Sequence, residues 1–304
     1  MVKTFSTVLL LFIGVVVFAQ NQQKLLLKKE LQTTPAKISY KDSIEVYSIT
    51  YASDSLKVNG YLVQPKTKGP HPVIIFNRGG NRDFGELILP YVYRFLGSLA
   101  KEGYVVIASQ YRGNGGSEGV EEFGGSDVDD VVNLIDVLAE IKEADTTRIG
   151  MYGWSRGGMM TLRALTEINK VKAAVVGGAL SDMRAGLERP EMERVYSELI
   201  PNYVNNKEAE LTKRSAIEWV DKLPTTVPLL MLHGNADWRV KSEQSLKLAI
   251  KFEKYRIPYR LVVFEGSDHG INENKSEVNK MVLNWFDRFL KNNEPLPDMN
   301  YHGR

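Results

Sequence analysis

The sequence predicts an α/β protein with a mostly parallel, doubly wound sheet covered by helices on both faces. One reason is size, since 304 residues that are 43% hydrophobic can bury one large core. Another is rhythm, because short apolar runs alternate with segments of helical periodicity. The apolar runs are residues 73–76, 104–108, 148–153, 171–176, 228–232 and 259–264. Strands that alternate with helices favour a parallel sheet, in which ligands bind beyond the carboxyl ends of the strands.

Residues 1–19 have the pattern of a secretion signal. Lys3 precedes an apolar run at 8–18, and Val17 and Ala19 place short side chains at the −3 and −1 positions of a cleavage site after Ala19. The alternative is a membrane anchor, but the apolar run is short for a span and polar residues follow it directly. The sequence therefore predicts a secreted or periplasmic protein with no membrane contact once the signal is removed.

Two segments of alternating polarity, 44–51 and 56–63, come before the first buried strand and predict an antiparallel hairpin. Residues 20–43 are polar and rich in lysine, so we expect a lead-in without a core of its own. The α/β domain is expected to span 44–292, and a tail to follow at 293–304.

The next elements are separated by loops rich in glycine. The first buried strand runs into such a loop, a helix follows, and the second buried strand opens a longer glycine-rich loop before another helix. The expected elements are a strand at 73–76, a loop at 77–81, a helix at 86–102, a strand at 104–108, a loop at 111–125 and a helix at 128–141.

Residues 148–158 carry the most specific chemical signal. A strand at 148–153 runs into Gly153-Trp154-Ser155-Arg156-Gly157, and helical residues follow from Met159. Strand, Gly-x-Ser-x-Gly and helix together make a nucleophile elbow, a sharp turn that exposes the serine and needs glycine on either side. The hydroxyl then stands at a helix N-terminus, which favours developing negative charge. Ser155 is the predicted nucleophile.

Residues 180–222 interrupt the alternation of strands and helices. The segment is charged and contains two prolines. Its apolar residues at helical spacing are Met192, Tyr196, Leu199, Ile200 and Tyr203. Because it follows a strand, it leaves the sheet at the carboxyl edge, where Ser155 lies, and we expect a small helical lid. Helices at 242–255 and from 278 to 289 complete the chain.

A serine hydroxyl needs a base to take its proton, and the base is most often histidine. His269 follows the last strand and completes the chain order Ser, Asp, His that this arrangement requires. His71 precedes a strand and His302 lies in the tail, so neither is placed at the carboxyl edge. His233 ends a strand, and we expect it to be a packing histidine with satisfied hydrogen bonds.

The acid that orients the base is predicted to be Asp237, in the loop after the strand at 228–232. Asp268 is the alternative, but it is adjacent to His269 in the chain and is better suited to cap a turn. Trp238 and Arg239 follow the acid and are candidates to line the substrate site, although packing within the loop explains them equally well.

The oxyanion of an acyl-transfer reaction needs two donors. One is expected to be the backbone N–H of Arg156, the residue after the nucleophile. The other is expected from the loop after the strand at 73–76, from Gly79 or alternatively Arg78. The side-chain amide of Asn77 is a further candidate to contact substrate.

Together these motifs resemble the catalytic domain of the prolyl oligopeptidase family of α/β-hydrolases. The motifs are Asn77-Arg78-Gly79-Gly80, Tyr111-Arg112-Gly113, the elbow with Gly157-Gly158, His233-Gly234 with Asp237, and Asp268-His269-Gly270. The resemblance covers about residues 40–292 and implies a catalytic triad of Ser155, Asp237 and His269. Larger members carry a β-propeller, for which the segment before the hairpin is too short.

The resemblance implies a serine hydrolase that cleaves peptide, amide or ester bonds through an acyl-enzyme. Alternatives are a carboxylesterase or acetyl esterase, an enzyme similar to dienelactone hydrolase, and, more remotely, a binding protein that has kept the fold without catalysis. No metal or other cofactor is expected. The net charge of +2 and the lack of a basic stripe argue against a nucleic-acid partner, so the expected partner is a small molecule or a peptide.

Overall fold

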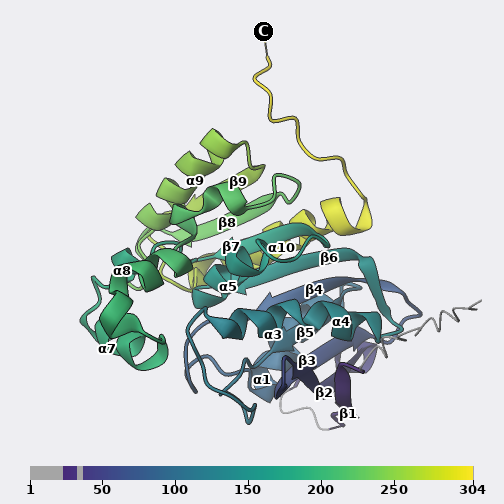
Figure 1. Cartoon of the computed structure of the whole chain (residues 1–304). Helices are drawn as coiled ribbons and strands as arrows, with labels where there is room; N and C mark the ends of the chain where they lie inside the picture. The colour runs from purple at the N-terminus through teal and green to yellow at the C-terminus, as the bar shows by residue number, and fades with distance from the viewer. Residues whose placement is uncertain (1–22, 33–36, 304) are drawn as a thin grey trace, which may run out of the picture.

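The computed structural model describes residues 23–32 and 37–303. Within them, nine strands form one sheet in the order β1-β2-β3-β5-β4-β6-β7-β8-β9 (Figure 1). The strands are β1 Leu25–Glu30, β2 Ile44–Ser53, β3 Leu56–Pro65, β4 His71–Asn77, β5 Val105–Ser109, β6 Ala144–Trp154, β7 Val171–Gly177, β8 Leu229–Gly234 and β9 Tyr259–Phe264. The predicted signal at 1–19 lies outside the described residues.

From β5 to β9 every neighbouring pair is parallel, whereas β1, β2, β3 and β5 pair antiparallel. The expectation of a mostly parallel sheet preceded by a hairpin is therefore confirmed, and the hairpin is β2–β3. The expected lead-in at 20–43 needs correction, because it contains β1, which pairs with β2. The run Leu-Leu-Leu-Lys-Lys-Glu does not alternate in polarity, so the sequence did not indicate a strand. Its side chains are mostly exposed, and β1 is held mainly by its backbone pairing with β2.

Helices connect the strands and cover both faces of the sheet. The α-helices are α1 Leu89–Tyr91, α2 Gly97–Ala100, α3 Asp129–Val132, α4 Leu134–Ala139, α5 Arg156–Ala164, α6 Met183–Gly186, α7 Pro190–Leu199, α8 Tyr203–Arg214, α9 Glu243–Tyr255 and α10 Lys275–Phe286. The helix expected over 86–102 begins later, at Leu89, because Pro90 fits only within a first turn.

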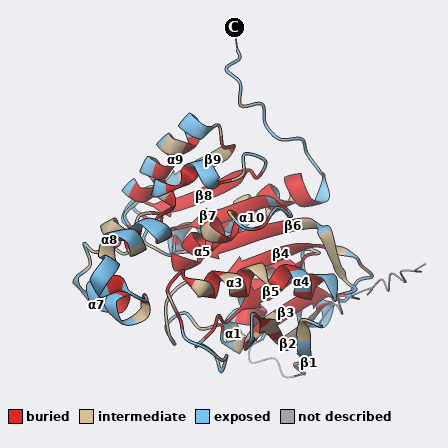
Figure 2. Ribbon diagram, viewed as in Figure 1, coloured by how far each residue is buried: buried red, intermediate tan, exposed pale blue. Residues whose placement is uncertain are grey.

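The sheet separates two hydrophobic cores. Along β4, Val73 and Ile75 belong to the core under α3, α4, α5 and α9, while Ile74 and Phe76 belong to the core under α2 and α10. Figure 2 shows the central strands mostly buried, with exposed residues on the outer faces of the helices. Among the described residues, no helix has the length and apolar character needed to cross a membrane. Burial on both faces explains why these strands are almost continuously apolar.

The chain reverses its direction across the sheet at β4. It passes from β4 to β5 on one side and then to β6 on the other, so β4 lies between them. At such a switch point the loops after neighbouring strands part and leave a crevice at the carboxyl edge. The loop after β4 and the elbow after β6 are the two segments that border it.

Candidate active site

Ser155 occupies the sharp turn between β6 and α5. Its φ and ψ are 59° and −124°, a strained pair for a residue with a side chain, and its N–H donates to the Gly177 carbonyl at 2.8 Å. The turn is so tight that a Cβ on Gly157 would lie 1.9 Å from the Asn77 carbonyl oxygen. Glycine is therefore required beside the serine, and the turn leaves Ser155 at the N-terminus of α5.

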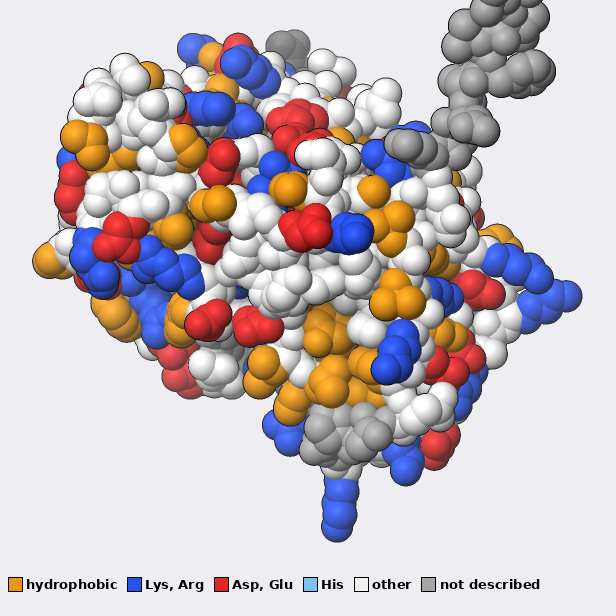
Figure 3. Space-filling model, turned by 60° about the horizontal axis from the view of Figure 1, so that its bottom comes forward, with side chains coloured by type: hydrophobic (Ala, Val, Ile, Leu, Met, Phe, Trp, Pro, Cys, Tyr) orange, Lys and Arg blue, Asp and Glu red, His pale blue; other side chains and the backbone are white. Residues whose placement is uncertain are grey.

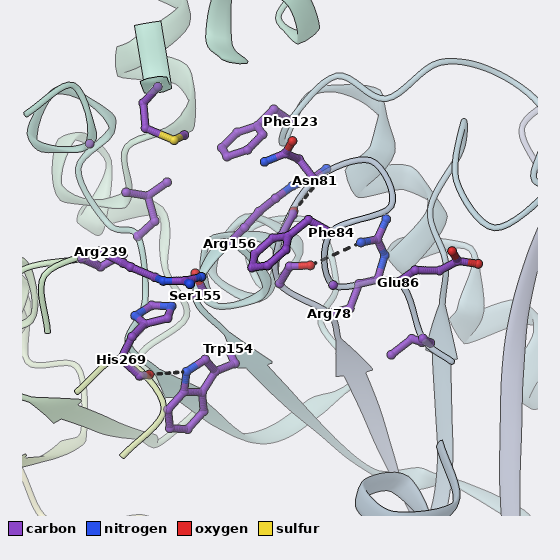
Figure 4. A pocket seen from close by; sticks show the side chains of 18 of the residues that line it. Arg78, Asn81, Phe84, Glu86, Phe123, Trp154, Ser155, Arg156, Arg239 and His269 are labelled. Atoms are coloured by element: carbon purple, nitrogen blue, oxygen red, sulfur yellow. Dashed lines mark hydrogen bonds between the residues drawn. The ribbon is translucent and has the colours of Figure 1, made fainter. Parts of the chain in front are cut away.

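Ser155 and His269 line one cavity of about 410 Å³, within the range of small-ligand sites. Figure 4 shows Arg239 and His269 beside Ser155, with Phe84 across from them. The lining includes exposed apolar side chains of Phe84 and Ile88. In Figure 3, which turns the side of α1 forward, hydrophobic side chains gather in a group surrounded by charged ones. The lining of the cavity thus combines apolar side chains with the guanidinium groups of Arg189 and Arg239.

Asp237 and His269 are in direct contact. The distance between Asp237 Oδ2 and His269 Nδ1 is 2.6 Å, and the carboxylate is buried. Oδ1 accepts the backbone N–H groups of Arg239 and Val240 at 2.8 and 3.0 Å. Burial would raise the pKa of Asp237, but hydrogen bonds from His233 and His269 hold it well below its usual range. The contact fixes the ring of His269 and leaves Nε2 as its available nitrogen.

Asp268 has a different role from Asp237. Its Oδ1 accepts the N–H of Gly270 at 2.8 Å and its side chain is exposed, as expected for a turn residue. His71 lies at the start of β4, at the opposite end of the strand from the loop that borders the cavity. The structure therefore joins Asp237 to His269 in the cavity that Ser155 lines, whereas Asp268 bonds its own turn and His71 lies at the other end of β4.

The loop after β4 runs directly beside the nucleophile. A Cβ on Gly79 would lie 3.3 Å from the Ser155 Cβ and 2.9 Å from the Trp154 carbonyl oxygen. On the other side, Arg156 is the first residue of α5, so its backbone N–H has no acceptor within the helix. The backbone of Gly79 and Arg156 thus flanks Ser155.

The last residue of β4 and the first residue of this loop serve as anchors. Arg78 lines the cavity, but its buried Nε donates to the Gln110 carbonyl at 3.0 Å and its own carbonyl accepts the Tyr111 hydroxyl at 3.2 Å. The buried amide of Asn77 donates to Thr161 Oγ1 at 2.8 Å, beneath the elbow and outside the cavity lining. This corrects the expectation that Asn77 contacts substrate: its amide joins β4 to α5.

The side chain of Arg156 forms a buried clamp that the sequence analysis did not foresee. Its guanidinium makes ion pairs with Glu121 and Asp127 and donates to the Gly80 carbonyl at 2.9 Å. Burial opposes the charge, but Asp127 and Glu121 raise the pKa of Arg156 above its usual value. Glu121 also accepts the backbone N–H of Arg82 at 2.7 Å. The clamp therefore joins the elbow, the loop after β4 and the loop after β5.

The two candidate substrate residues after the acid differ. Arg239 lines the cavity, with its guanidinium 5.3 Å from the centre of the Phe84 ring. Trp238 is 65% exposed and is absent from the cavity lining, and Arg189 and Arg239 lie over its ring. Arg239 is thus placed to meet a bound molecule, whereas Trp238 lies at the outer surface.

The predicted lid consists of α6, α7 and α8, followed by two short 3₁₀ turns. Met192 and Tyr196 of α7 are buried and line the cavity together with Ser155. Arg82, in the loop after β4, makes an ion pair with Glu198 of α7. The insertion therefore closes one side of the cavity. Leu199 is only partly buried and does not belong to the lining.

Within residues 23–32 and 37–303, no group of three or more histidine and acidic side chains is placed to hold a metal ion. The chemistry that the site offers comes from a serine on an elbow, an imidazole bound to a carboxylate, and backbone N–H groups. With the strand order of the sheet, these features define an α/β-hydrolase.

The chain belongs to the prolyl oligopeptidase family, peptidase family S9, whose family model matches residues 93–293. The uncharacterised peptidase YtmA of Bacillus subtilis (strain 168) is 28% identical over 251 residues, covering 82% of this chain and 94% of YtmA. The chain is thus an S9-family hydrolase, and the match covers almost the full length of YtmA.

Solved structures agree with the fold. The acylaminoacyl peptidase of Pyrococcus horikoshii superposes with a TM-score of 0.71 at 24% identity, covering 84% of this chain and 43% of that one. An acetyl xylan esterase from Paenibacillus sp. R4 superposes with a TM-score of 0.65 at 18% identity, covering 87% and 90%. The chain therefore spans less than half of the first structure and nearly all of the second, and these likenesses concern the fold.

Proposed function

We propose that this S9-family hydrolase cleaves peptide or amide bonds by a triad of Ser155, His269 and Asp237. The observation that carries the proposal is the 2.6 Å contact between Asp237 and His269 in the same cavity as Ser155. With Nδ1 bound to the acid, Nε2 is the nitrogen that takes the Ser155 proton as the hydroxyl attacks the carbonyl carbon. The N–H groups of Arg156 and Gly79 stabilise the oxyanion.

The reaction then proceeds through an acyl-enzyme. His269 gives its proton to the leaving amine, and the C–N bond breaks. A water molecule, deprotonated by His269, attacks the ester of Ser155, and the carboxylic acid product leaves as the serine recovers its proton. Arg239 lies where it can donate to a polar group of the substrate, while the apolar lining accepts its side chains.

The test is hydrolysis of matched pairs of substrates by the purified protein. Each pair has the same acyl group, joined either as a peptide amide or as a short aryl ester. We expect both to be cleaved, with Ser155→Ala inactive on both. Cleavage of esters alone would favour the esterase alternative, and activity that survives in Ser155→Ala would overturn the triad.

We also propose that the protein is exported, on the evidence of the signal pattern at 1–19. Expression of the full sequence in a bacterial host, followed by N-terminal sequencing of the exported protein, tests this. A chain that begins at Gln20 supports export and cleavage after Ala19. A chain that stays uncleaved in the cytoplasm contradicts both.

A further inference from the structure

His233 is a buried histidine that the proposed mechanism does not use. It lies in β8, four residues before Asp237, and its side chain has no exposed surface. Its Nδ1 is 2.7 Å from Ser245 Oγ, and its Nε2 is 2.7 Å from the Val240 carbonyl oxygen. The same Nε2 is 3.3 Å from Asp237 Oδ2. His233 thus contacts both the acid and the loop that carries it.

The partners of His233 determine where its proton lies. A carbonyl oxygen can only accept, so the contact with Val240 requires a hydrogen on Nε2. Nδ1 of a neutral ring is then an acceptor, and the Ser245 hydroxyl of α9 supplies the donor. The Nε2–H donates to the Val240 carbonyl, and Asp237 Oδ2 lies 3.3 Å from the same nitrogen. The second oxygen of Asp237 therefore lies between two imidazole rings.

We propose that His233 is a positioning residue for the triad: its N–H holds Asp237 Oδ2 and limits how strongly that oxygen binds the His269 imidazolium. The inference rests on the proposed function, because it assigns a role through Asp237 and His269. The backbone N–H groups of Arg239 and Val240 already occupy Oδ1, so His233 and His269 share Oδ2. Three hydrogen bonds and the 3.3 Å contact with His233 thus surround one carboxylate.

The expected consequence is a change in the pH dependence of the reaction. Without the N–H of His233, Oδ2 loses a donor and holds the protonated ring of His269 more tightly. The base then stays protonated to higher pH. Among the described residues, the charged side chains near His269 include Arg239, which lines the same cavity, and Asp268, which precedes it in the chain. Gly178, which packs on the His269 ring from the loop after β7, carries no charge. None of these residues changes in the variants below.

Two variants of similar size separate the N–H from simple packing. Glutamine at 233 places a side-chain N–H near the position of Nε2, whereas asparagine reaches only as far as Nδ1 and can still bond Ser245. In His233→Asn, we expect the acid limb of the kcat/KM profile to move up by about 0.5–1 pH unit, the size of one hydrogen bond. In His233→Gln, we expect the profile of the natural enzyme.

The same comparison can be made without turnover. The Cε1–H signal of His269, followed by NMR as a function of pH in the enzyme without substrate, should show the same displacement in His233→Asn and not in His233→Gln. Ser245→Ala serves as the control, since it removes the partner of Nδ1 and leaves the N–H toward Asp237 in place. Its profile should follow that of the natural enzyme.

Equal profiles for His233→Asn and the natural enzyme would overturn the inference, as would equal displacement in the asparagine and glutamine variants. Asp237→Asn separates this failure from a failure of the proposed function. If Asp237→Asn is inactive while His233→Asn keeps the natural profile, only the role of His233 is wrong. If Asp237→Asn stays active, the triad is wrong and the role of His233 falls with it.

Discussion

The two sides of the cavity hold their functional groups by different means. On the nucleophile side, the ion pairs of Arg156 with Glu121 and Asp127 tie three loops together. On the acid side, hydrogen bonds from backbone and imidazole N–H groups surround one carboxylate, Asp237. The direction of a backbone N–H group depends on the conformation of its loop, so the nucleophile side needs rigid loops. The orientation of a side-chain carboxylate depends on its hydrogen-bond partners, so the acid side needs well-placed donors.

The largest expected effect comes from removing the nucleophile, on which both sides converge. Ser155→Ala should lower kcat by about 10⁶, the loss found when a catalytic serine is removed. A fluorophosphonate probe should label the natural protein and not the variant. Ser181→Ala is the matched control, because its buried hydroxyl donates to the Gln244 carbonyl at 3.2 Å and is outside the cavity lining. Labelling that persists in Ser155→Ala contradicts the assignment.

The next effect tests the acid side. Asp237→Asn should lower kcat by about 10⁴ while the fold remains. The two backbone donors at Oδ1 fix the amide oxygen there, so the new NH₂ group faces Nδ1 of His269 and can only donate to it. His269 then carries its hydrogen on Nε2, the nitrogen that should take the serine proton. Steady-state kinetics with circular dichroism measure both properties. Asp268→Asn should keep most activity, and the reverse order would mean that Asp268 is the acid.

A third prediction tests the clamp on the nucleophile side. Arg156→Met leaves Glu121 and Asp127 buried without a cation, and should destabilise the protein by about 3–5 kcal/mol. Denaturant unfolding measures the loss. Arg163→Met, on the same helix with a more exposed partner in Glu167, should cost less.

Charge compensation sharpens the same test. Adding Glu121→Gln and Asp127→Asn to Arg156→Met removes the uncompensated charges and should recover part of the lost stability. A triple variant that is less stable than Arg156→Met alone would show that the hydrogen bonds and packing of the network, and not its charge balance, stabilise the protein.

The smallest effect concerns the lid, which borders the cavity on one side. Met192→Ala should change the ranking of substrates by acyl or peptide length, because Met192 lines the cavity. Leu199→Ala is the control on the same helix, since Leu199 lies outside the lining. Both variants are assayed against one series of substrates and against an aryl acetate. If Met192→Ala leaves the ranking of substrates unchanged, the insertion does not select substrates by length.

The features that could be predicted from the sequence are those that depend on residues close together in the chain. The elbow is encoded by consecutive residues around Ser155, and the order of strands places Asp237 and His269 in loops at the same edge. The hairpin β2–β3 follows from alternation within a short stretch. In each case local periodicity or glycine spacing has one structural solution, so the fold class and the arrangement of these loops could be predicted.

The features that sequence analysis missed depend on contacts between distant segments. Arg156 pairs with residues 29 and 35 positions earlier, in a loop without periodicity. His233 is buried with both ring nitrogens bonded, as expected of a packing histidine, but nothing in Leu-His-Gly indicates that Nε2 also lies near Asp237. Asn77 was expected in the loop, but it is the last residue of β4 and its side chain bonds Thr161 beneath the elbow. The direction of a side chain at the end of a strand or in an irregular loop is set by its tertiary neighbours, which local patterns do not record.

The connection between β7 and β8 has a consequence for how this scaffold can change over evolution. Two adjacent parallel strands can be joined by a crossover of about a dozen residues. Here residues 178–228 make that link, and they include α6, α7 and α8. Most of the segment is thus surplus to connectivity, and buried residues such as Met192 and Tyr196 pack it against the core and into the cavity wall. A change in the length or shape of this segment would therefore alter the cavity, while the strand pairing that positions Ser155, Asp237 and His269 is kept.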